Sequence, residues 1–181
     1  MNEVSGRYST MKDEFYVPEA DKVAPQSTDN KQGRATKAFD KATAEKIIGQ
    51  LEAGQKDAYE NYSELIDSGL AREIARINLP LSLYTEFYWE MDLHNLFHFL
   101  KLRLDSHAQY EIRVYAEVIL EMCRKVAPMA TESFINHMNH GVNFSGEEME
   151  ALRAVMEGKP NPLEGKKLDR FNEKIKTGVQ L

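Results

Sequence analysis

One segment of the chain alternates in the manner of a β-strand, and this restricts the sheet that the protein can form. Residues 83–91 are rich in aromatic side chains, a composition that favours strands. The two sides of this segment carry Thr85, Phe87, Trp89 and Met91 and, opposite them, Tyr84, Glu86, Tyr88 and Glu90. Because one strand cannot form a sheet, its partners must come from weakly patterned segments, from missing sequence, or from another copy of the chain.

Helical periodicity dominates the remaining sequence. Apolar residues recur at spacings of three, four and seven over 44–66, which predicts a long helix ending at Ser68 and Gly69. A short helix is expected to follow as far as Asn78, because the residue before Pro80 resists helical geometry. The sequence thus predicts an α+β fold, predominantly helical with a small and incomplete sheet.

Further helices are indicated by caps and apolar stripes. Asp92 is a candidate N-cap for a helix carrying Leu93, Leu96, Phe97 and Leu100. Ser106 fits the first position of a capping box, and the helix after it would place Cys123 in the core. Its expected inner face comprises Ala108, Ile112, Tyr115, Ala116, Ile119 and Cys123.

The end of the chain, 141–181, reads as a helical segment of a single domain over 1–181. A second capping box, from Ser145 to Glu148, precedes a helix with Met149, Leu152 and Met156. A Gly- and Pro-rich linker near 158–165 then leads to a small helix with Leu168, Phe171 and Ile175.

Composition excludes some classes of function. The 181 residues are 42% hydrophobic and 29% charged, as in globular proteins. A formal charge of −6 argues against binding a nucleic-acid polymer. The lone Cys123 excludes an internal disulfide, and no apolar run has the length of a membrane span or signal peptide. We therefore expect a cytoplasmic protein.

The polar stretch over 21–37 predicts a long loop, either mobile or part of a site.

The N-terminal residues combine groups suited to a phosphorylated ligand. Glu3 offers an acceptor, Ser5 a small donor and Arg7 a forked cation, while Gly6 lets the backbone approach a ligand closely. In an extended segment, Glu3, Ser5 and Arg7 would share one face. The alternative is a solvated chain end.

Polar groups also gather on the helix that begins near Asp92. His94 and His98 are four residues apart and so share a helix face. The segment lacks the Glu of a zincin motif, and spacing fixes no third metal ligand, so a polar ligand or a solvated pair is favoured over a metal. Arg103 could bind a ligand or stabilise the helix end, and Arg113 could pair with Glu117.

Three segments in order, 2–9, 78–89 and 100–113, resemble flavin-dependent thymidylate synthases. They read Asn-Glu-Val-Ser-Gly-Arg-Tyr-Ser, Asn-Leu-Pro-Leu-Ser-Leu-Tyr-Thr-Glu-Phe-Tyr-Trp and Leu-Lys-Leu-Arg-Leu-Asp-Ser-His-Ala-Gln-Tyr-Glu-Ile-Arg. The family motif runs Arg-His-Arg-x-x-Ser-x-Asn-Glu-x-Ser-x-Arg-Tyr, and this chain enters it at Asn2. The likeness is good from residue 2 to about 134 and looser beyond residue 145.

The resemblance implies methylation of dUMP to dTMP, with methylenetetrahydrofolate as carbon donor and NADPH as reductant through FAD. By position, the dUMP-binding residues would be Glu3, Val4, Ser5, Gly6, Arg7, Arg76 and Arg103. Arg103 would be catalytic, lying against the uracil and favouring its ionisation. FAD would contact Glu3, Asp92, Leu93, His94 and His98, although family members often carry Asn or Arg where this chain has Asp92, His94 or His98.

The family is homotetrameric, with active sites shared between protomers, and needs no nucleophilic cysteine. Because the Arg-His-Arg-x-x-Ser half of the motif is absent, we expect this chain alone to be inactive or severely impaired and an upstream segment to restore activity. Two alternatives are a non-catalytic remnant that binds nucleotide or flavin, and a helical interaction protein in which the arginines are surface charges.

Overall fold

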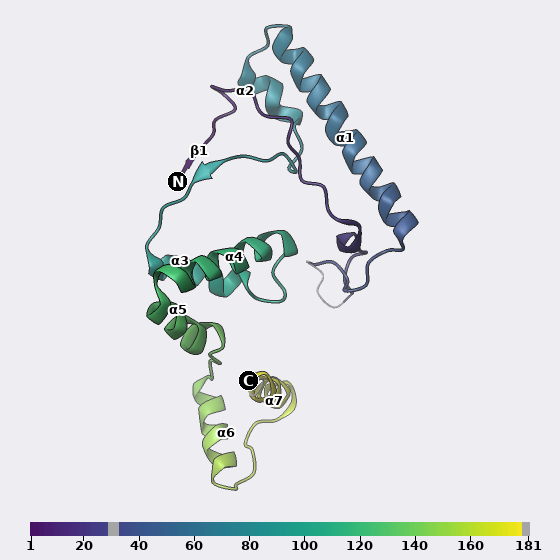
Figure 1. Cartoon of the computed structure of the whole chain (residues 1–181). Coiled ribbons are helices and arrows are strands. Elements are labelled where there is room, and N and C mark those ends of the chain that lie inside the picture. The colour runs from purple at the N-terminus through teal and green to yellow at the C-terminus, as the bar shows by residue number, and fades with distance from the viewer. Residues whose placement is uncertain (29–32, 179–181) are drawn as a thin grey trace. The chain divides into compact units, whose positions relative to one another are not determined.

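The computed structural model describes residues 1–28 and 33–178, which fold as two compact units (Figure 1). The first unit is Met1–Asp92, and the second begins at Leu93. The single domain predicted over 1–181 stays a prediction. Of the predicted polar loop, residues 29–32 lie outside the described residues.

The long helix of the first unit, α1, spans Lys41–Asp67 and confirms the prediction from periodicity. It begins after Asp40, whose side chain accepts a hydrogen bond from the Thr43 N–H at 3.0 Å. It ends in a Schellman motif, in which the Leu70 N–H donates to the Leu65 carbonyl at 3.1 Å. Gly69 has a φ of 87°, a conformation that favours glycine.

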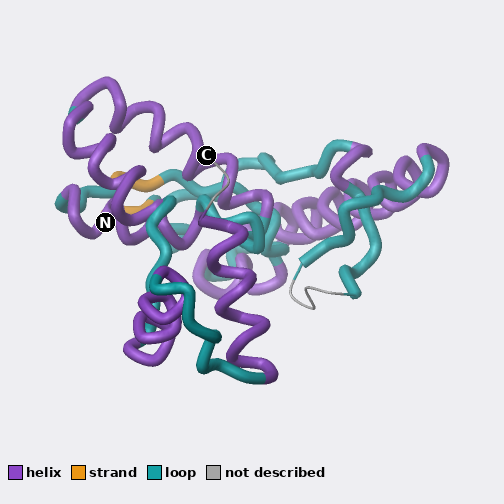
Figure 2. Tube along the Cα trace, turned by 90° about the horizontal axis from the view of Figure 1, so that it is seen from below, coloured by secondary structure: helices purple, strands orange, loops and turns teal. Residues whose placement is uncertain are grey.

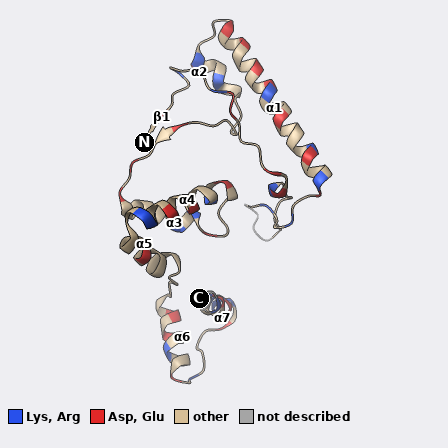
Figure 3. Ribbon diagram, viewed as in Figure 1, with Lys and Arg blue, Asp and Glu red and all other residues tan. Residues whose placement is uncertain are grey.

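Charged side chains of both signs cover α1 (Figure 3). Lys41 with Glu45 and Lys56 with Glu60 form i,i+4 ion pairs at 3.7 and 3.6 Å. Such exposed pairs contribute a few tenths of a kcal/mol each, roughly 0.3–0.5. The buried positions of α1 are Ala44, Gln55 and Tyr62, so its inner face is partly polar.

Short helices complete the first unit. The 3₁₀ helix η1 spans Ala20–Lys22, α2 spans Arg72–Ala75, and the 3₁₀ helix η2 continues it over Arg76–Asn78. The chain leaves the helical conformation at Leu79, directly before Pro80, as predicted.

The sheet of the first unit is small, with two short antiparallel strands (Figure 2). β1 is Asn2–Glu3 and β2 is Phe87–Tyr88, with Asn2 opposite Tyr88. Of the three origins left open for the partner of the predicted strand, the structure shows the first: β1 belongs to the same chain and lies in its polar N-terminal residues.

The predicted strand over 83–91 is wrong in its length. The first residues of this segment run beside residues 14–16, and the Tyr84 N–H donates to the Glu14 carbonyl at 2.9 Å. An isolated bridge joins Phe15 and Leu83. Phe87 and Tyr88 are 51% and 86% exposed, so no described element covers the strand. Because neither face is buried, side-chain packing does not stabilise a longer strand.

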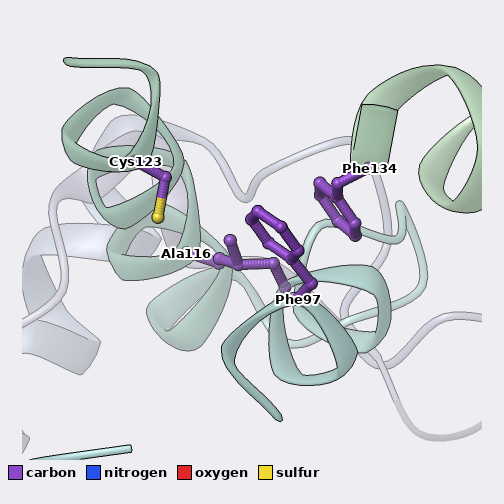
Figure 4. Packing of buried hydrophobic residues seen from close by; sticks show 5 residues of the cluster. Phe97, Ala116, Cys123 and Phe134 are labelled. Atoms are coloured by element: carbon purple, nitrogen blue, oxygen red, sulfur yellow. The ribbon is translucent and has the colours of Figure 1, made fainter. Parts of the chain in front are cut away.

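Four consecutive helices form the first part of the second unit. These are α3 (Leu93–Arg103), α4 (Tyr110–Val126), α5 (Pro128–Phe134) and the π-helix η3 (Ile135–Asn139). Their core contains Phe97 stacked on Phe134, with ring centroids 4.6 Å apart and planes inclined by 10° (Figure 4). Cys123 is buried in the same cluster, as predicted.

Two predictions for these helices are wrong. The capping box at Ser106 does not form: α4 begins after Gln109, because the Asp105 side chain takes the His107 N–H at 2.8 Å and holds the intervening residues in a turn. Tyr115, assigned to the inner face, is 60% exposed. α5 and η3 were not predicted, since a helix that starts at Pro128 directly after another leaves no linker pattern.

The last two helices form a separate small core. α6 spans Gly146–Met156 and α7 spans Gly165–Gly178, with the predicted capping box at Ser145 and the predicted linker between the helices. The buried residues are Ala151, Leu163 and Phe171, with Phe144, Leu152, Leu168 and Ile175 packed around them.

The predicted apolar stripe of α6 is partly wrong, since Met149 and Met156 are 39% and 80% exposed. α7 packs against the side of α6 that carries Ala151 and Leu152. Among the described helices of the whole chain, none is long and apolar enough to cross a bilayer.

Candidate functional site

The N-terminal segment leaves the sheet and turns sharply. The Val4 N–H donates to the Glu86 carbonyl at 2.9 Å, which is the last bond of the ladder. The Ser5 carbonyl then accepts from the N–H groups of Tyr8 and Ser9 at 3.0 and 3.1 Å, and the Ser5 Oγ accepts from the Arg7 N–H at 3.3 Å. The expectation of an extended face shared by Glu3, Ser5 and Arg7 is therefore wrong, because local hydrogen bonds close a turn after Ser5.

The turn over residues 5–9, which we call the N-terminal turn, lies against η2. A Cβ atom added to Gly6 would lie 2.9 Å from the Met11 Sδ, 3.2 Å from the Arg76 Cδ and 3.3 Å from the Arg76 Nη1. Only glycine therefore fits here without moving Met11 or Arg76. Two candidate residues that are 70 positions apart in the sequence are thus in direct contact.

An open cleft of about 480 Å³ lies at this contact. Five of the residues predicted to bind nucleotide line it: Glu3, Val4, Ser5, Gly6 and Arg76. A second hollow of about 380 Å³ borders the β1–β2 ladder, and Glu3 and Val4 line both. A backbone turn, a hydroxyl and a guanidinium meet at the larger cleft, which suits an anionic ligand.

Arg7 is held beside the cleft by α2. Its Nε lies 3.2 Å from Glu73 Oε2, with the side chains of Arg7 and Glu73 59% and 54% exposed. Glu73 was not predicted as part of the site, and its position on α2, three residues before Arg76 at the start of η2, is the one pattern that could have indicated it.

An exposed ion pair fixes the far side of the ladder. Lys12 Nζ donates to Glu86 Oε1. This hydrogen bond lowers the pKa of the Glu86 carboxyl and raises the pKa of the Lys12 amine. Because the Glu86 carbonyl also accepts from the Val4 N–H, this ion pair lies close to the start of the N-terminal turn.

In the second unit, α3 carries the histidine pair. The Nε2 atoms of His94 and His98 are 3.2 Å apart, and the rings meet edge to face with centroids 4.6 Å apart. Both side chains are exposed, whereas Leu93 packs against the core and so anchors the start of the helix. The pair presents ring nitrogens that can donate or accept a hydrogen bond. Within 1–28 and 33–178, no three His, Cys, Asp or Glu residues gather as a metal site would require.

Arg103 is the last residue of α3, and its side chain is exposed. The loop after it is braced from both sides. Asp105 accepts from the backbone N–H and ring Nδ1 of His107 at 2.8 and 2.9 Å, which lowers the pKa of its carboxyl. Arg113 donates to the Ser106 carbonyl at 3.0 Å and lies 3.9 Å from Glu117, the partner predicted for it.

The structure thus gathers the candidate residues in two sets. The first unit brings six of the seven nucleotide-binding candidates together at or beside the cleft, and α3 carries the seventh, Arg103, with Leu93, His94 and His98. Asp92 is the residue directly before α3. The assignment of a ligand role to each of these residues stays a prediction.

Comparison with known proteins identifies the group to which the chain is similar. The family described as thymidylate synthase complementing protein matches residues 1–129, and the thymidylate synthase ThyX C-terminal domain matches residues 142–181. The second match begins before Ser145, near the start of the α6–α7 core.

Relatives and solved structures agree. The flavin-dependent thymidylate synthase of Treponema denticola is 56% identical over 100% of this chain and 68% of its own length, and that of Treponema pallidum is 54% identical over 99% and 59%. The chain therefore spans about three fifths to two thirds of the length of these relatives. A UMP/dUMP methylase, PolB from Streptomyces cacaoi, bound with 5-Br UMP, has a TM-score of 0.69 at 33% identity, over 75% of this chain and 62% of that one. With cleft, turn and family matches in agreement, the chain belongs to the flavin-dependent thymidylate synthase family.

Proposed function

We propose that the protein takes part in the reductive methylation of dUMP to dTMP. The cleft where Gly6 meets Arg76 is the observation that carries this proposal, because it combines a turn, a hydroxyl and a guanidinium in the family's motif residues. The solved neighbour PolB is described as a UMP/dUMP methylase and was solved with 5-Br UMP and with 5-Br dUMP.

The residues around the cleft would hold the nucleotide. Ser5 and the backbone at Gly6 supply small donors, and Arg7 and Arg76 supply cations for the phosphate. Glu3 and Val4 line both hollows, so Glu3 is placed to reach the nucleotide and a neighbouring flavin.

The exposed face of α3 fits a polar, anionic cofactor, since the paired His94 and His98 rings can donate hydrogen bonds. Asp92, Leu93, His94 and His98 would hold FAD. Bound there and reduced by NADPH, FAD would supply the hydride for the one-carbon unit, and methylenetetrahydrofolate would be the carbon donor.

Arg103 would stabilise negative charge on the uracil ring. A guanidinium stays protonated, so it can favour the ionised base without itself giving up a proton. No nucleophile from this chain is needed. The buried Cys123 agrees, because burial raises the pKa of its thiol and so disfavours the reactive thiolate.

Self-association is the third part of the proposal. α4 exposes a row of apolar side chains at spacings of three and four: Tyr115, Val118, Met122 and Val126, between 55% and 82% exposed. An exposed apolar stripe of this kind is typical of a helix that pairs with another chain. We therefore propose a homotetramer with shared active sites, as in the family.

The test has two parts. Equilibrium dialysis should show that the 181-residue chain binds dUMP and that Arg76→Ala weakens binding at least tenfold, whereas Arg153→Ala on α6 does not. For turnover, the family's Arg-His-Arg-x-x-Ser segment from the Treponema denticola relative is fused before Met1, and dTMP formation is assayed with FAD, NADPH and methylenetetrahydrofolate. Binding without turnover in the fusion would favour a non-catalytic nucleotide-binding protein. Absence of dUMP binding in both chains would refute the proposal.

A further inference from the structure

A row of polar side chains on α1 faces the interior of the first unit. Gln55, Tyr59 and Tyr62 are spaced by four and three residues, so they lie on one face of the helix. Gln55 and Tyr62 are only 8% and 1% exposed, which is unusual for polar groups unless they have hydrogen-bond partners. Their hydrogen-bond partners are Met11, Tyr16 and Ser82, and Met11 lies two residues after the N-terminal turn.

Two of these side chains hold a single residue by its backbone. The Met11 N–H donates to the Tyr62 hydroxyl oxygen at 3.0 Å, and the Met11 carbonyl accepts from the Tyr59 hydroxyl at 2.9 Å. Both polar groups of the Met11 peptide backbone are therefore bound to one helix. Burial raises the pKa of the Tyr59 phenol, so it stays protonated and able to donate at neutral pH.

The third side chain fixes the segment after Met11. The Gln55 amide donates to the Tyr16 carbonyl at 2.9 Å and to the Ser82 hydroxyl at 3.1 Å. The segment from Met11 to Tyr16 is thus held along α1 over seven residues of the helix, a rise of about 10 Å. Ring contacts support it, since Phe15 meets Tyr59 edge to face with centroids 6.2 Å apart.

The Met11 side chain connects α1 to the candidate site. Its Sδ lies 2.9 Å from where a Cβ on Gly6 would be, and the residue lines the same cleft as Ser5, Gly6 and Arg76. A shift of the Met11 backbone would therefore move the surface on which Gly6 rests.

We propose that Tyr59 and Tyr62 are positioning residues for nucleotide binding, acting through Met11 on the turn formed by Ser5, Gly6 and Arg7. Neither tyrosine lines the cleft. That the ligand is dUMP rests on the proposed function, whereas the hydrogen bonds that fix the turn do not.

The test removes single hydroxyl groups and keeps the rings. Tyr62→Phe and Tyr59→Phe are compared with Thr131→Val, a control that removes a buried hydroxyl in the second unit, the donor to the Ala127 carbonyl at 2.8 Å. We expect Tyr62→Phe to raise the Kd for dUMP about tenfold, since it leaves a partly buried N–H without its acceptor. Tyr59→Phe should raise it less, and Thr131→Val not at all. The same order is expected for the exchange rates of the amides of residues 5–11, measured by NMR without ligand.

A double-mutant cycle separates positioning from general destabilisation. If Tyr62 acts through the turn, then Tyr62→Phe in a Gly6→Ala chain should add little to the loss caused by Gly6→Ala alone. Full additivity would contradict the proposal, as would a Tyr62→Phe protein with the dUMP affinity and amide exchange of Thr131→Val. If Tyr62→Phe does not fold, Tyr59→Phe carries the same comparisons.

The two proposals fail in different ways. If neither the wild-type chain nor the fused chain binds dUMP, the proposed function is wrong, while amide exchange still tests the positioning role. Faster exchange at Met11 in Tyr62→Phe than in Thr131→Val would then support the role, and equal exchange would overturn it.

Discussion

At the scale of single residues, Gly6 is the position in the candidate site where a side chain would meet its neighbours most closely. Gly6→Ala places a methyl group against the Met11 sulfur and the Arg76 side chain, both of which are flexible enough to move. We expect little loss of stability but at least tenfold weaker dUMP binding, because the Arg76 guanidinium must leave its place. Isothermal titration and thermal unfolding would measure the two effects.

Gly54→Ala is the matched control. Gly54 lies within α1, and a Cβ there would meet no atom within 4 Å. Alanine should therefore stabilise the helix by about 1 kcal/mol and leave dUMP affinity unchanged. If the two variants bind dUMP equally well, the close approach at Gly6 has no role in the site.

Cys123 shows the opposite case, a reactive residue type in a structural role. It is 4% exposed and packs in the core of the second unit. Cys123→Ser should cost about 2 kcal/mol, because it buries a hydroxyl. It should retain dUMP binding and, in the fused chain, turnover, since the proposed reaction uses no thiol. Denaturant unfolding and the dTMP assay check this, and lost turnover in a folded Cys123→Ser protein would contradict it.

At the scale of elements, the α6–α7 core is secured by the ion pair of Glu148 with Lys174, beside a more exposed pair of Glu147 with Lys167. Glu148 completes the capping box of α6 and accepts from Lys174 Nζ of α7 at 2.8 and 2.7 Å. The hydrogen bond from Lys174, followed by that from the Ser145 N–H, lowers the pKa of the Glu148 carboxyl. Lys174 also donates to the Asn143 carbonyl at 2.9 Å, so it closes the loop before α6.

This contact predicts a pH dependence with a definite sign. Because the pKa of Glu148 is lowered by folding, its stabilisation is present above the usual carboxyl pKa and is lost as the pH falls through the lowered value. Glu148→Gln should reduce the loss of α6–α7 stability at acid pH, which we call the acid limb. The NMR signals of Ala151 and Phe171 would monitor this unfolding. Glu150→Gln, at an exposed position of the same helix, should leave the acid limb unchanged, and identical acid limbs in wild type and Glu148→Gln would refute the prediction.

The elements also show what sequence patterns can predict. The long helix α1 and the capping box of α6 were predicted correctly, since periodicity and caps act within a few residues. The strand near Phe87 was predicted too long, because its length depends on whether other segments cover it. The Ser106 cap failed because Asp105, one residue earlier, accepts from the His107 N–H and holds these residues in a turn.

The site was predictable only in part for the same reason. The motif of residues 2–9 and its likeness to a family indicated Gly6 and Arg76, but spacing alone could not show their contact. Glu73, Tyr59 and Tyr62 were missed, because their partners are backbone or side-chain atoms about 50 to 70 residues away.

At the scale of the whole molecule, self-association should be visible in stability. A protein that assembles only when folded gains stability with concentration, so Tm should rise as the chain is concentrated. Met122→Lys, in the exposed row on α4, should remove this rise and reduce the mass measured by sedimentation. Asp67→Lys at the end of α1 serves as control, and a wild-type Tm independent of concentration would contradict the proposal.

The division of the chain after Asp92 has a consequence for genetics. Arg7 lies in one unit and Arg103 in the other, so either arginine can be removed while the other set of candidate residues stays intact. If sites combine residues from different protomers, fused chains carrying Arg7→Ala and Arg103→Ala, each inactive alone, should complement each other when co-expressed, because mixed assemblies contain some sites with both arginines. Absence of complementation would indicate that both arginines of every site come from one chain.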